Sequence, residues 1–179
     1  GNTKDVVNEY LNAQPEAREE SSTSNIQPKD IININGTRFT NVDVSNTEGK
    51  KILKSNDKLK ITLKYDSDKK DFITSPRIVI TVINELSKNV VLRLDSDVTQ
   101  NSINDKIKPE GEIICETKDS INLTEGKYLV DVDFLIEGTS VNHMQGIRKF
   151  EVETDLPEYN YKNYPDRNVC DNVIKYEFK

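Results

Sequence analysis

The most constraining feature of the sequence is a strict alternation of apolar and polar residues in KLKITLKY, residues 58–65. Every second residue from Leu59 to Tyr65 is apolar, and lysines and a threonine stand between them. Successive side chains of an extended strand point to opposite faces. The segment therefore predicts a half-buried strand, with one face in a core and one face in water.

Similar apolar segments recur along the chain at roughly 8–14-residue spacing, with turn signals between them. The expected strand segments are 31–34 with 39–44, 58–65, 77–84, 90–95, 112–117, 123–138, 147–153 and 172–178. Residues 139–146 are expected to form a loop. No helical segment of core-forming length interrupts the series. The pattern predicts an all-β fold, an antiparallel β-sandwich of about eight or nine short strands.

A turn motif supports the sandwich. Leu123, Gly126 and Tyr128 form an LxxGxY pattern like the tyrosine corner of Greek-key sandwiches. We expect Gly126 to permit the turn and the Tyr128 hydroxyl to bond a nearby backbone group.

The N-terminal part of the chain differs from the rest. Residues 4–12 carry apolar side chains at helical spacing, which predicts a short amphipathic helix. Residues 13–29 are rich in Glu, Ser, Asn, Gln and Pro, which is typical of a polar linker. We therefore divide the chain into a helix and linker, residues 1–29, and a β-sandwich domain with a C-terminal strand extension, residues 30–179.

The charge of the chain excludes some partners. Lys and Arg number 25 against 31 Asp and Glu, a formal net charge of −6. Phosphate backbones and anionic lipid surfaces are bound through an excess of cations, which this chain lacks. We expect no nucleic-acid partner.

Cysteine and histidine are scarce. Two cysteines and one histidine are too few for a zinc site with four such ligands. Cys115, in an apolar segment, is expected to be a small buried side chain, and a disulfide to Cys170 is the alternative. The acidic segments 66–71 and 95–105 lack the spacing of a calcium loop, so we expect solvated loops and no metal site.

The sequence contains no recognisable catalytic motif. A phosphate-binding GxxxxGK[ST] loop, a GxSxG elbow and an HExxH pair are all missing. A Ser-His-Asp triad would have to use His143, which falls in the expected loop. We therefore predict no catalytic residues and no enzyme activity.

Three tyrosines cluster near the C-terminus. Tyr159, Tyr161 and Tyr164 lie beside two prolines. Exposed tyrosines can stack on sugars and bond them with the same side chain. The alternative is a C-terminal extension that packs these rings onto its own sandwich.

An ordered set of segments carries a family resemblance over about residues 30–159. They are GTRFTNVDVSN (36–46), SNDKLKITLKY (55–65), SPRIVITVIN (75–84), LDSDVTQ (94–100), EIICET (112–117), LTEGKYLVDVDF (123–134) and KFEVETD (149–155). This order resembles the C-terminal domain of Wzt-type ATP-binding subunits, which belong to ABC transporters that export O-antigen polysaccharide. Such domains often end with a Trp-bearing strand, whereas this chain has no Trp and carries NVIKYEF there.

The resemblance implies an Ig-like β-sandwich that binds the exported polysaccharide. It implies recognition of the modified, non-reducing end of the chain, which would license export. It further implies a homodimer, with C-terminal strands exchanged between subunits, and a transmembrane permease as partner. The location implied is cytoplasmic, at the inner face of the bacterial inner membrane. ATP and Mg²⁺ would belong to an upstream ATPase domain, so no cofactor is expected here.

Parity within four segments predicts which side chains face the core. Segments 77–84, 90–95, 127–136 and 147–153 are expected to form one sheet of the Ig-like sandwich. The residues expected to face inwards are Ile78, Ile80, Val82, Tyr128, Val130, Val132, Phe134, Phe150 and Val152.

The opposite parity predicts a candidate sugar-binding face. It would carry Arg77, Thr81, Arg93, Asp95, Asp131, Asp133 and Lys149, with His143 at its rim. Carboxylates and guanidinium groups on one face can bond sugar hydroxyls in bidentate fashion. The alternative interpretation is a solvated sheet face with alternating charges.

Two functional hypotheses follow. The first is a non-catalytic carbohydrate-binding domain that recognises O-antigen, in particular its non-reducing terminus. The second is a structural or interaction module that dimerises or binds another protein by strand exchange, with residues 172–178 as the donated strand.

Overall fold

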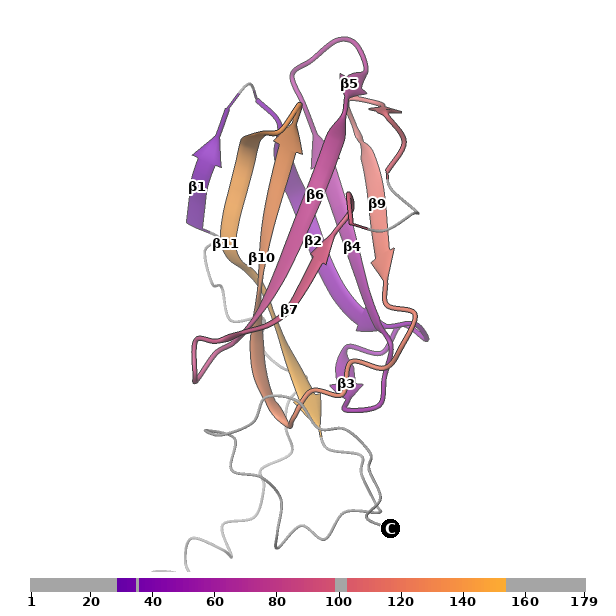
Figure 1. Cartoon of the computed structure of the whole chain (residues 1–179), viewed down its shortest axis with the longest axis vertical. Helices are drawn as coiled ribbons and strands as arrows, with labels where there is room; N and C mark the ends of the chain where they lie inside the picture. Colours follow the sequence, from indigo (N-terminus) through magenta and orange to yellow (C-terminus); the bar gives the residue numbers. More distant parts are fainter. Residues whose placement is uncertain (1–28, 35, 99–102, 154–179) are drawn as a thin grey trace, which may run out of the picture.

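The computed structural model describes residues 29–34, 36–98 and 103–153. Eleven strands lie in these residues, arranged as two sheets packed face to face and one small strand pair (Figure 1). The described residues contain no helix, so none of them forms a helix that could span a membrane. The predicted all-β, Ig-like antiparallel sandwich is confirmed.

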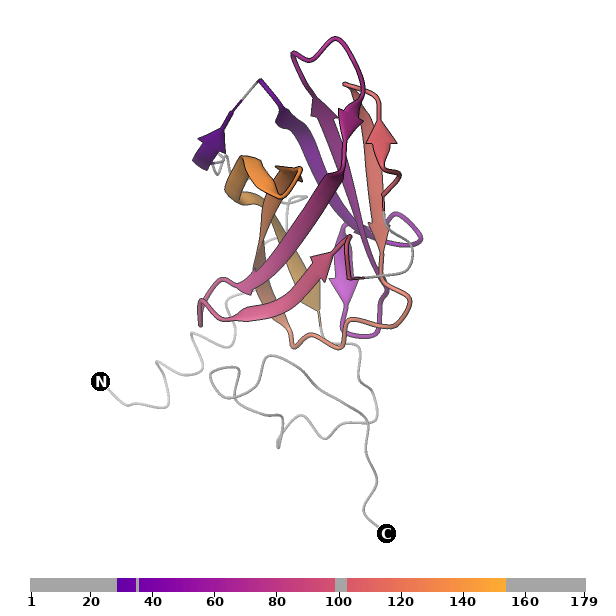
Figure 2. The same cartoon turned by 45° about the horizontal axis from the view of Figure 1, so that its top comes forward.

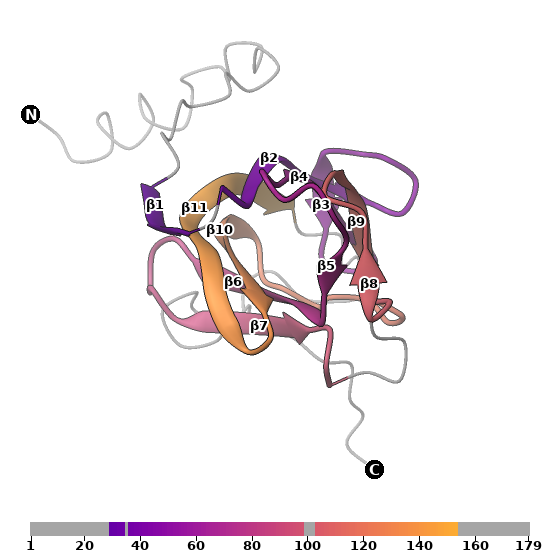
Figure 3. The same ribbon diagram turned by 90° about the horizontal axis from the view of Figure 1, so that it is seen from above.

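The larger sheet contains the four segments that parity analysis grouped together. Its order is β1 (Lys29–Asn33), β11 (Thr139–Glu153), β10 (Gly126–Ile136), β6 (Pro76–Asn84) and β7 (Val90–Asp95), and β3 (Ile52–Lys54) adds to the end of β11. All pairs are antiparallel except β11 with β3. Seen from above, β6 crosses between β10 and β7, and β7 forms one edge of the sheet (Figure 3).

The smaller sheet lies against the inner face of the larger one. Its order is β2 (Arg38–Asn46), β4 (Leu59–Asp66) and β9 (Gly111–Glu116), all antiparallel. A separate pair joins β5 (Ile73–Thr74) to β8 (Lys106–Ile107). Strands β3, β5 and β8 have only two or three residues, which is too short to show a period in the sequence.

The two faces of β4 are as the alternation in residues 58–65 predicts, one in the core and one outside. Leu59, Ile61, Leu63 and Tyr65 are all buried, and the residues between them face outwards. On the outer face, Lys60 and Lys64 form ion pairs with acidic side chains of β9. This outer face of the smaller sheet is therefore a charge-compensated, solvated surface.

Aromatic packing joins the two sheets across the core. Phe134 of β10 lies between Phe39 of β2 and Tyr65 of β4, with ring centroids 5.6 and 5.5 Å away. The Tyr65 contact is edge-to-face, a favoured geometry for aromatic pairs. These rings fix which faces of the two sheets point inwards.

The chain changes sheets between β1 and β2, and a buried amide holds this crossing. The Asn142 side chain accepts a bond from the Phe39 N–H at 3.1 Å and donates one to the Ile32 carbonyl at 2.9 Å. Gly36 lies in the turn with φ of +64°, and the Asp68 carboxylate occupies the space that a side chain there would need. Gly36 thus lies where the chain crosses between the sheets.

The tyrosine corner is confirmed, with one correction. The buried Tyr128 hydroxyl donates to the Thr124 carbonyl at 2.8 Å. The left-handed residue of the corner, however, is Asn122, with φ of +50°, and Gly126 has no positive φ. Asn is one of the residues that tolerate this conformation, so the expected role of Gly126 is wrong.

The expected loop at residues 139–146 is also wrong. These residues are the first half of β11, which runs without a break to Glu153 (Figure 2). Three residues between Met144 and Arg148 stand opposite Asp131 alone, so β11 contains a bulge with two extra residues. The bulge breaks the period-two pattern, which explains why the first half of the strand reads as a loop.

Several predictions lie outside the described residues. They concern the helix at 4–12, residues 13–28 of the linker at 13–29, Tyr159, Tyr161 and Tyr164, the strand at 172–178 and a bond to Cys170. They stay predictions. Lys29, the last residue of the expected linker, is the first residue of β1.

The tyrosine corner yields a stability test. Tyr128→Phe leaves the ring in place but removes the donor to the Thr124 carbonyl, so we expect a loss of about 1–3 kcal/mol in the free energy of unfolding. Urea denaturation measures it. Tyr65→Phe is the matched control, with a smaller expected loss, because the Tyr65 hydroxyl bond to Lys108 is longer, at 3.2 Å. Equal effects would contradict the account.

Candidate functional site

The outer face of the larger sheet brings together the residues that parity predicted. All nine residues expected to face inwards are buried, as the core of the sandwich requires. Parity then places the candidate residues on the opposite face of β6, β7, β10 and β11. We call this surface the polar face; it consists of Arg77, Thr81, Arg93, Asp95, Asp131, Asp133, His143 and Lys149.

Strand register arranges most of these side chains in two adjacent rows. Thr81 of β6 lies between Arg93 of β7 and Asp131 of β10. The next row runs from Asp95 through Val79 to Asp133 and then to His143 of β11. Directly opposed side chains on one sheet face are close enough to interact. The rows therefore present hydroxyl, carboxylate and cationic groups side by side.

A bidentate ion pair anchors one end of the polar face. Arg77 Nε donates to Asp95 Oδ1 at 3.0 Å, and Arg77 Nη2 donates to Asp95 Oδ2 at 2.7 Å. Asp97 adds a longer contact at 3.5 Å. The Asp95 side chain is 8% exposed, and the hydrogen bonds from Arg77 hold the pKa of its carboxyl below the ordinary value. This pair is a rigid part of the surface.

Arg93 stands next to this pair and is much less constrained. Its side chain is 61% exposed, and the contact of its Nη2 with Asp95 Oδ2 is 3.9 Å long. Arg93 is therefore a cation that a ligand or partner can reach.

The carboxylate of Asp131 is oriented by the bulge in β11. Its Oδ1 accepts a bond from the Gly146 N–H at 2.7 Å. Gly146 has φ of +60°, a conformation that glycine adopts without strain. Sequence reasoning missed Gly146, because nothing marks a bulge inside a polar segment.

Asp133 is oriented in a similar way by Ser140 and lies near His143. Ser140 Oγ donates to Asp133 Oδ1 at 2.5 Å, and His143 Nδ1 is 3.9 Å from the same oxygen. His143 belongs to β11 and faces its neighbours across the sheet, so its expected place in a loop is wrong. The carboxylate stands next to the serine, whereas a catalytic triad places the histidine there.

Lys149 lies apart from the two rows. It stands opposite Leu129 and forms an ion pair with Glu85 at 2.6 Å, near the β6–β7 turn. The Lys149 ammonium is therefore paired with a carboxylate of the same chain, away from the two rows.

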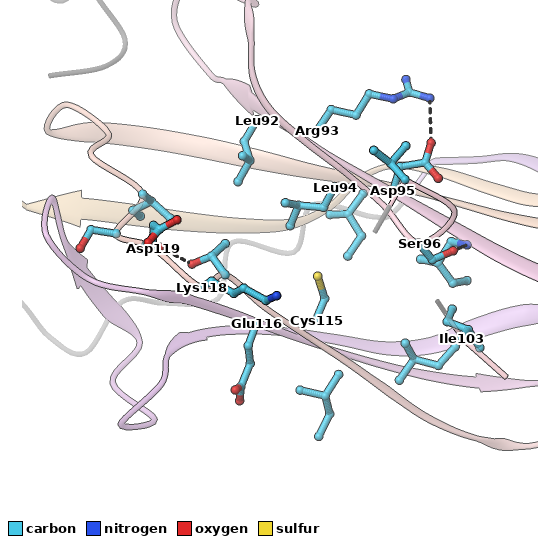
Figure 4. Close-up of a pocket in the computed structure, with 18 of the residues that line it drawn as sticks. Leu92, Arg93, Leu94, Asp95, Ser96, Ile103, Cys115, Glu116, Lys118 and Asp119 are labelled. Carbon is cyan, nitrogen blue, oxygen red and sulfur yellow. Dashed lines mark hydrogen bonds and ion pairs between the residues drawn. The ribbon is translucent and has the colours of Figure 1, made fainter. Parts of the chain in front are cut away.

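A cleft that sequence reasoning missed opens beside the polar face, between β7 and β9 (Figure 4). Its volume is about 920 Å³. Leu92 and Leu94 point into it from β7, and Cys115 points into it from β9. Burial raises the pKa of the Cys115 thiol, which is half-buried and packs against the core. We call this space the edge cleft, because both of its walls are edge strands.

Of three comparisons with known proteins, only the comparison of structures gives a match. No family model matches the sequence. No curated protein matches it either. Among solved structures, the crystal structure of the C-terminal domain of Wzt is similar over 75% of this chain and 83% of that chain, with a TM-score of 0.61 and 9% identity. The chain has the Wzt C-terminal domain fold. The family resemblance read from the ordered segments is therefore confirmed at the level of the fold.

The Wzt likeness assigns no role to any residue of the polar face. At 9% identity, few side chains coincide between the two domains, so the site has to be argued from this chain alone.

The ion pair of Arg77 and Asp95 yields a prediction about pH. Asp95→Asn removes the charged acceptor, and we expect it to lower the melting temperature by several degrees at neutral pH. Because the pKa of Asp95 is lowered in the fold, this stabilisation is fully present above the pKa of an unfolded aspartate, about 3.9. It is lost as the pH falls through the lower native value.

Thermal unfolding of both proteins between neutral and acidic pH measures the difference. Asp97→Asn is the control, because its contact with Arg77 is longer and more exposed, and we expect almost no change. A deficit of Asp95→Asn that stays constant down to the most acidic pH would contradict the assignment.

Proposed function

We propose that this chain is a non-catalytic carbohydrate-binding domain that binds the polysaccharide substrate of an ABC exporter at its polar face. The observation that carries the proposal is the pair of rows on four adjacent strands, where Thr81, Asp131, Asp133, Arg93 and Asp95 stand together. The Wzt C-terminal domain fold supports the context of polysaccharide export.

The chemistry of the rows suits a hydroxyl-rich ligand. Asp131 and Asp133 are each held through one carboxylate oxygen by a donor of β11. Within the described part of the chain, no donor contacts the second oxygen of either carboxylate, so it can accept from a sugar hydroxyl. Thr81 and Arg93 supply further polar groups in the same rows. The two oriented carboxylates bind with little loss of side-chain entropy.

The ligand we propose is O-antigen, recognised at its non-reducing terminus. This part of the proposal rests on the resemblance to Wzt-type subunits. Exposed Arg93 at the edge of the rows would suit an acidic terminal modification, because guanidinium pairs with carboxylate or phosphate. Binding of the completed end would couple polymer completion to export without a chemical step in this domain.

The cellular setting follows from the same resemblance. We propose a cytoplasmic domain at the inner face of the inner membrane, joined to an ATPase domain and working with a transmembrane permease. ATP and Mg²⁺ would act in that ATPase domain, so we propose no cofactor or metal for this one. Exchange of residues 172–178 between two subunits stays a prediction.

The edge cleft favours a second candidate function, an interaction module. β7 and β9 are edge strands of the larger and smaller sheet, and an added strand can pair with such an edge. An interaction module would bind protein and would show no affinity for glycan.

Binding of the full chain to purified O-antigens, with and without their terminal modification, tests the proposal. Asp131→Asn keeps an oxygen that can accept from Gly146 but loses the charge, and we expect at least about tenfold weaker binding. Glu116→Gln, on the outer face of the smaller sheet, is the matched control and should bind like the parent chain.

Affinity electrophoresis or calorimetry gives the readout. Binding to a native, end-modified polymer that Asp131→Asn weakens and Glu116→Gln leaves unchanged supports the polar face as the site. Normal binding by Asp131→Asn would contradict that location. No binding to a panel that contains the cognate polymer would favour the interaction module.

A further inference from the structure

Two irregular points of β11 each bring a hydrogen-bond donor to a carboxylate of β10. At the bulge that follows Met144, the Gly146 N–H donates to Asp131 Oδ1 at 2.7 Å. The register shifts again between Phe134 and Leu135 of β10, and next to this shift Ser140 Oγ donates to Asp133 Oδ1 at 2.5 Å. Bulges often lie next to functional sites, where they re-aim a side chain. Both irregularities of the β10–β11 pair therefore serve acids of the polar face.

The two donors hold the carboxylates apart. Asp131 and Asp133 lie two residues apart on one face of β10, so their Cα atoms are about 7 Å apart at the rise of an extended strand. Gly146 lies in the bulge opposite Asp131. Ser140 lies opposite Leu135, on the side of Asp133 that is away from Asp131. The bonds thus direct the two carboxylates to separate points of the face.

The second oxygen of each carboxylate meets no donor in the described part of the chain. His143 Nδ1 approaches Asp133 at the oxygen that Ser140 already holds. Arg77 donates to both oxygens of Asp95, and no ion pair joins it to Asp133 among the described residues. The polar face therefore presents two fixed acceptor oxygens that a ligand has to satisfy.

The chemistry of these oxygens restricts the ligand. An ionised carboxylate accepts hydrogen bonds and donates none. A hydroxyl group has one hydrogen to donate, so two separate carboxylates need two separate hydroxyl groups. A hydroxyl that carries an ester or a methyl ether has lost this hydrogen and offers only acceptor oxygens. Such a group would leave the carboxylate desolvated without a donor, which is costly.

We propose that the polar face recognises its polysaccharide through two free hydroxyl groups, one at Asp131 and one at Asp133, and that O-acylation of these hydroxyls prevents binding. Gly146 and Ser140 are positioning residues, because they act through the two carboxylates. The inference rests on the proposed function, since it names the chemical class of polymer that the same face binds. That class is a glycan whose contact hydroxyls are unesterified.

Chemical O-acetylation of the ligand tests the need for donors. The probe is a purified O-antigen that binds the full parent chain, measured by calorimetry before and after partial O-acetylation. We expect O-acetylation to weaken binding at least about tenfold, the effect of losing a hydrogen bond to a charged group. Removal of the added esters with mild alkali should restore the affinity.

Variants of the two acids distinguish a lost donor from a steric effect of the ester. Asp131→Asn and Asp133→Asn each introduce an amide that can donate to an ester oxygen. We expect each variant to bind the untreated polymer more weakly than the parent chain and to lose less affinity on O-acetylation. Glu112→Gln, on the outer face of the smaller sheet, should show the full loss of the parent chain.

The role of Ser140 is tested separately. Ser140→Ala removes the donor that holds Asp133, so we expect severalfold weaker binding of the untreated polymer. Ser140→Thr keeps a hydroxyl at the same position and should bind like the parent chain. Circular dichroism shows that each variant is folded.

The possible failures are distinguishable. Equal binding of the polymer before and after O-acetylation would overturn this inference and leave the proposed function in place. An equal loss on O-acetylation in the parent chain and in both Asn variants would place the effect away from the two carboxylates, and would also overturn it. A parent chain that binds no polymer of the panel would overturn the proposed function and this inference together.

Discussion

The packing of Phe134 between Phe39 and Tyr65 is the interaction on which the rest of the structure depends. It joins the two sheets through one ring of the larger sheet and two of the smaller. Once Phe134 points inwards, its neighbours Asp133 and Leu135 must point outwards, since side chains alternate along a strand. The β10 part of the polar face is therefore a direct consequence of core packing: Asp131 and Asp133 could not move inwards without reversing the core parity of β10.

Much of this arrangement could be predicted from the sequence, because core and surface alternate with a period of two. The parity of residues 77–84 and 127–136 placed Ile78 and Phe134 in the core and Thr81 and Asp131 outside, as the structure has them. The sequence pattern predicts a loop at His143, because the bulge that follows Met144 interrupts the period-two alternation of β11. A bulge breaks the regular spacing of apolar residues, so a strand that contains one is not recognised from that spacing.

Contacts between strands could not be predicted in the same way. The bidentate bond of Arg77 to Asp95 and the bond of Gly146 to Asp131 depend on how β6 meets β7 and how β10 meets β11. The alternation of apolar and polar residues predicts which face of the sheet a side chain lies on. It does not predict which residues of two neighbouring strands lie opposite each other. The edge cleft could not be predicted for a related reason. It lies between edge strands of two different sheets, so no single segment of the sequence indicates it.

The central claim is that polysaccharide binds on the polar face of the larger sheet. The most direct measurement is a nuclear magnetic resonance titration of the isotopically labelled full chain with purified O-antigen. The account predicts that amide shifts concentrate at the facing residues of β6, β7 and β10, around Thr81, Arg93 and Asp131. Shifts confined to the outer face of the smaller sheet, around Lys60 and Lys64, would contradict it.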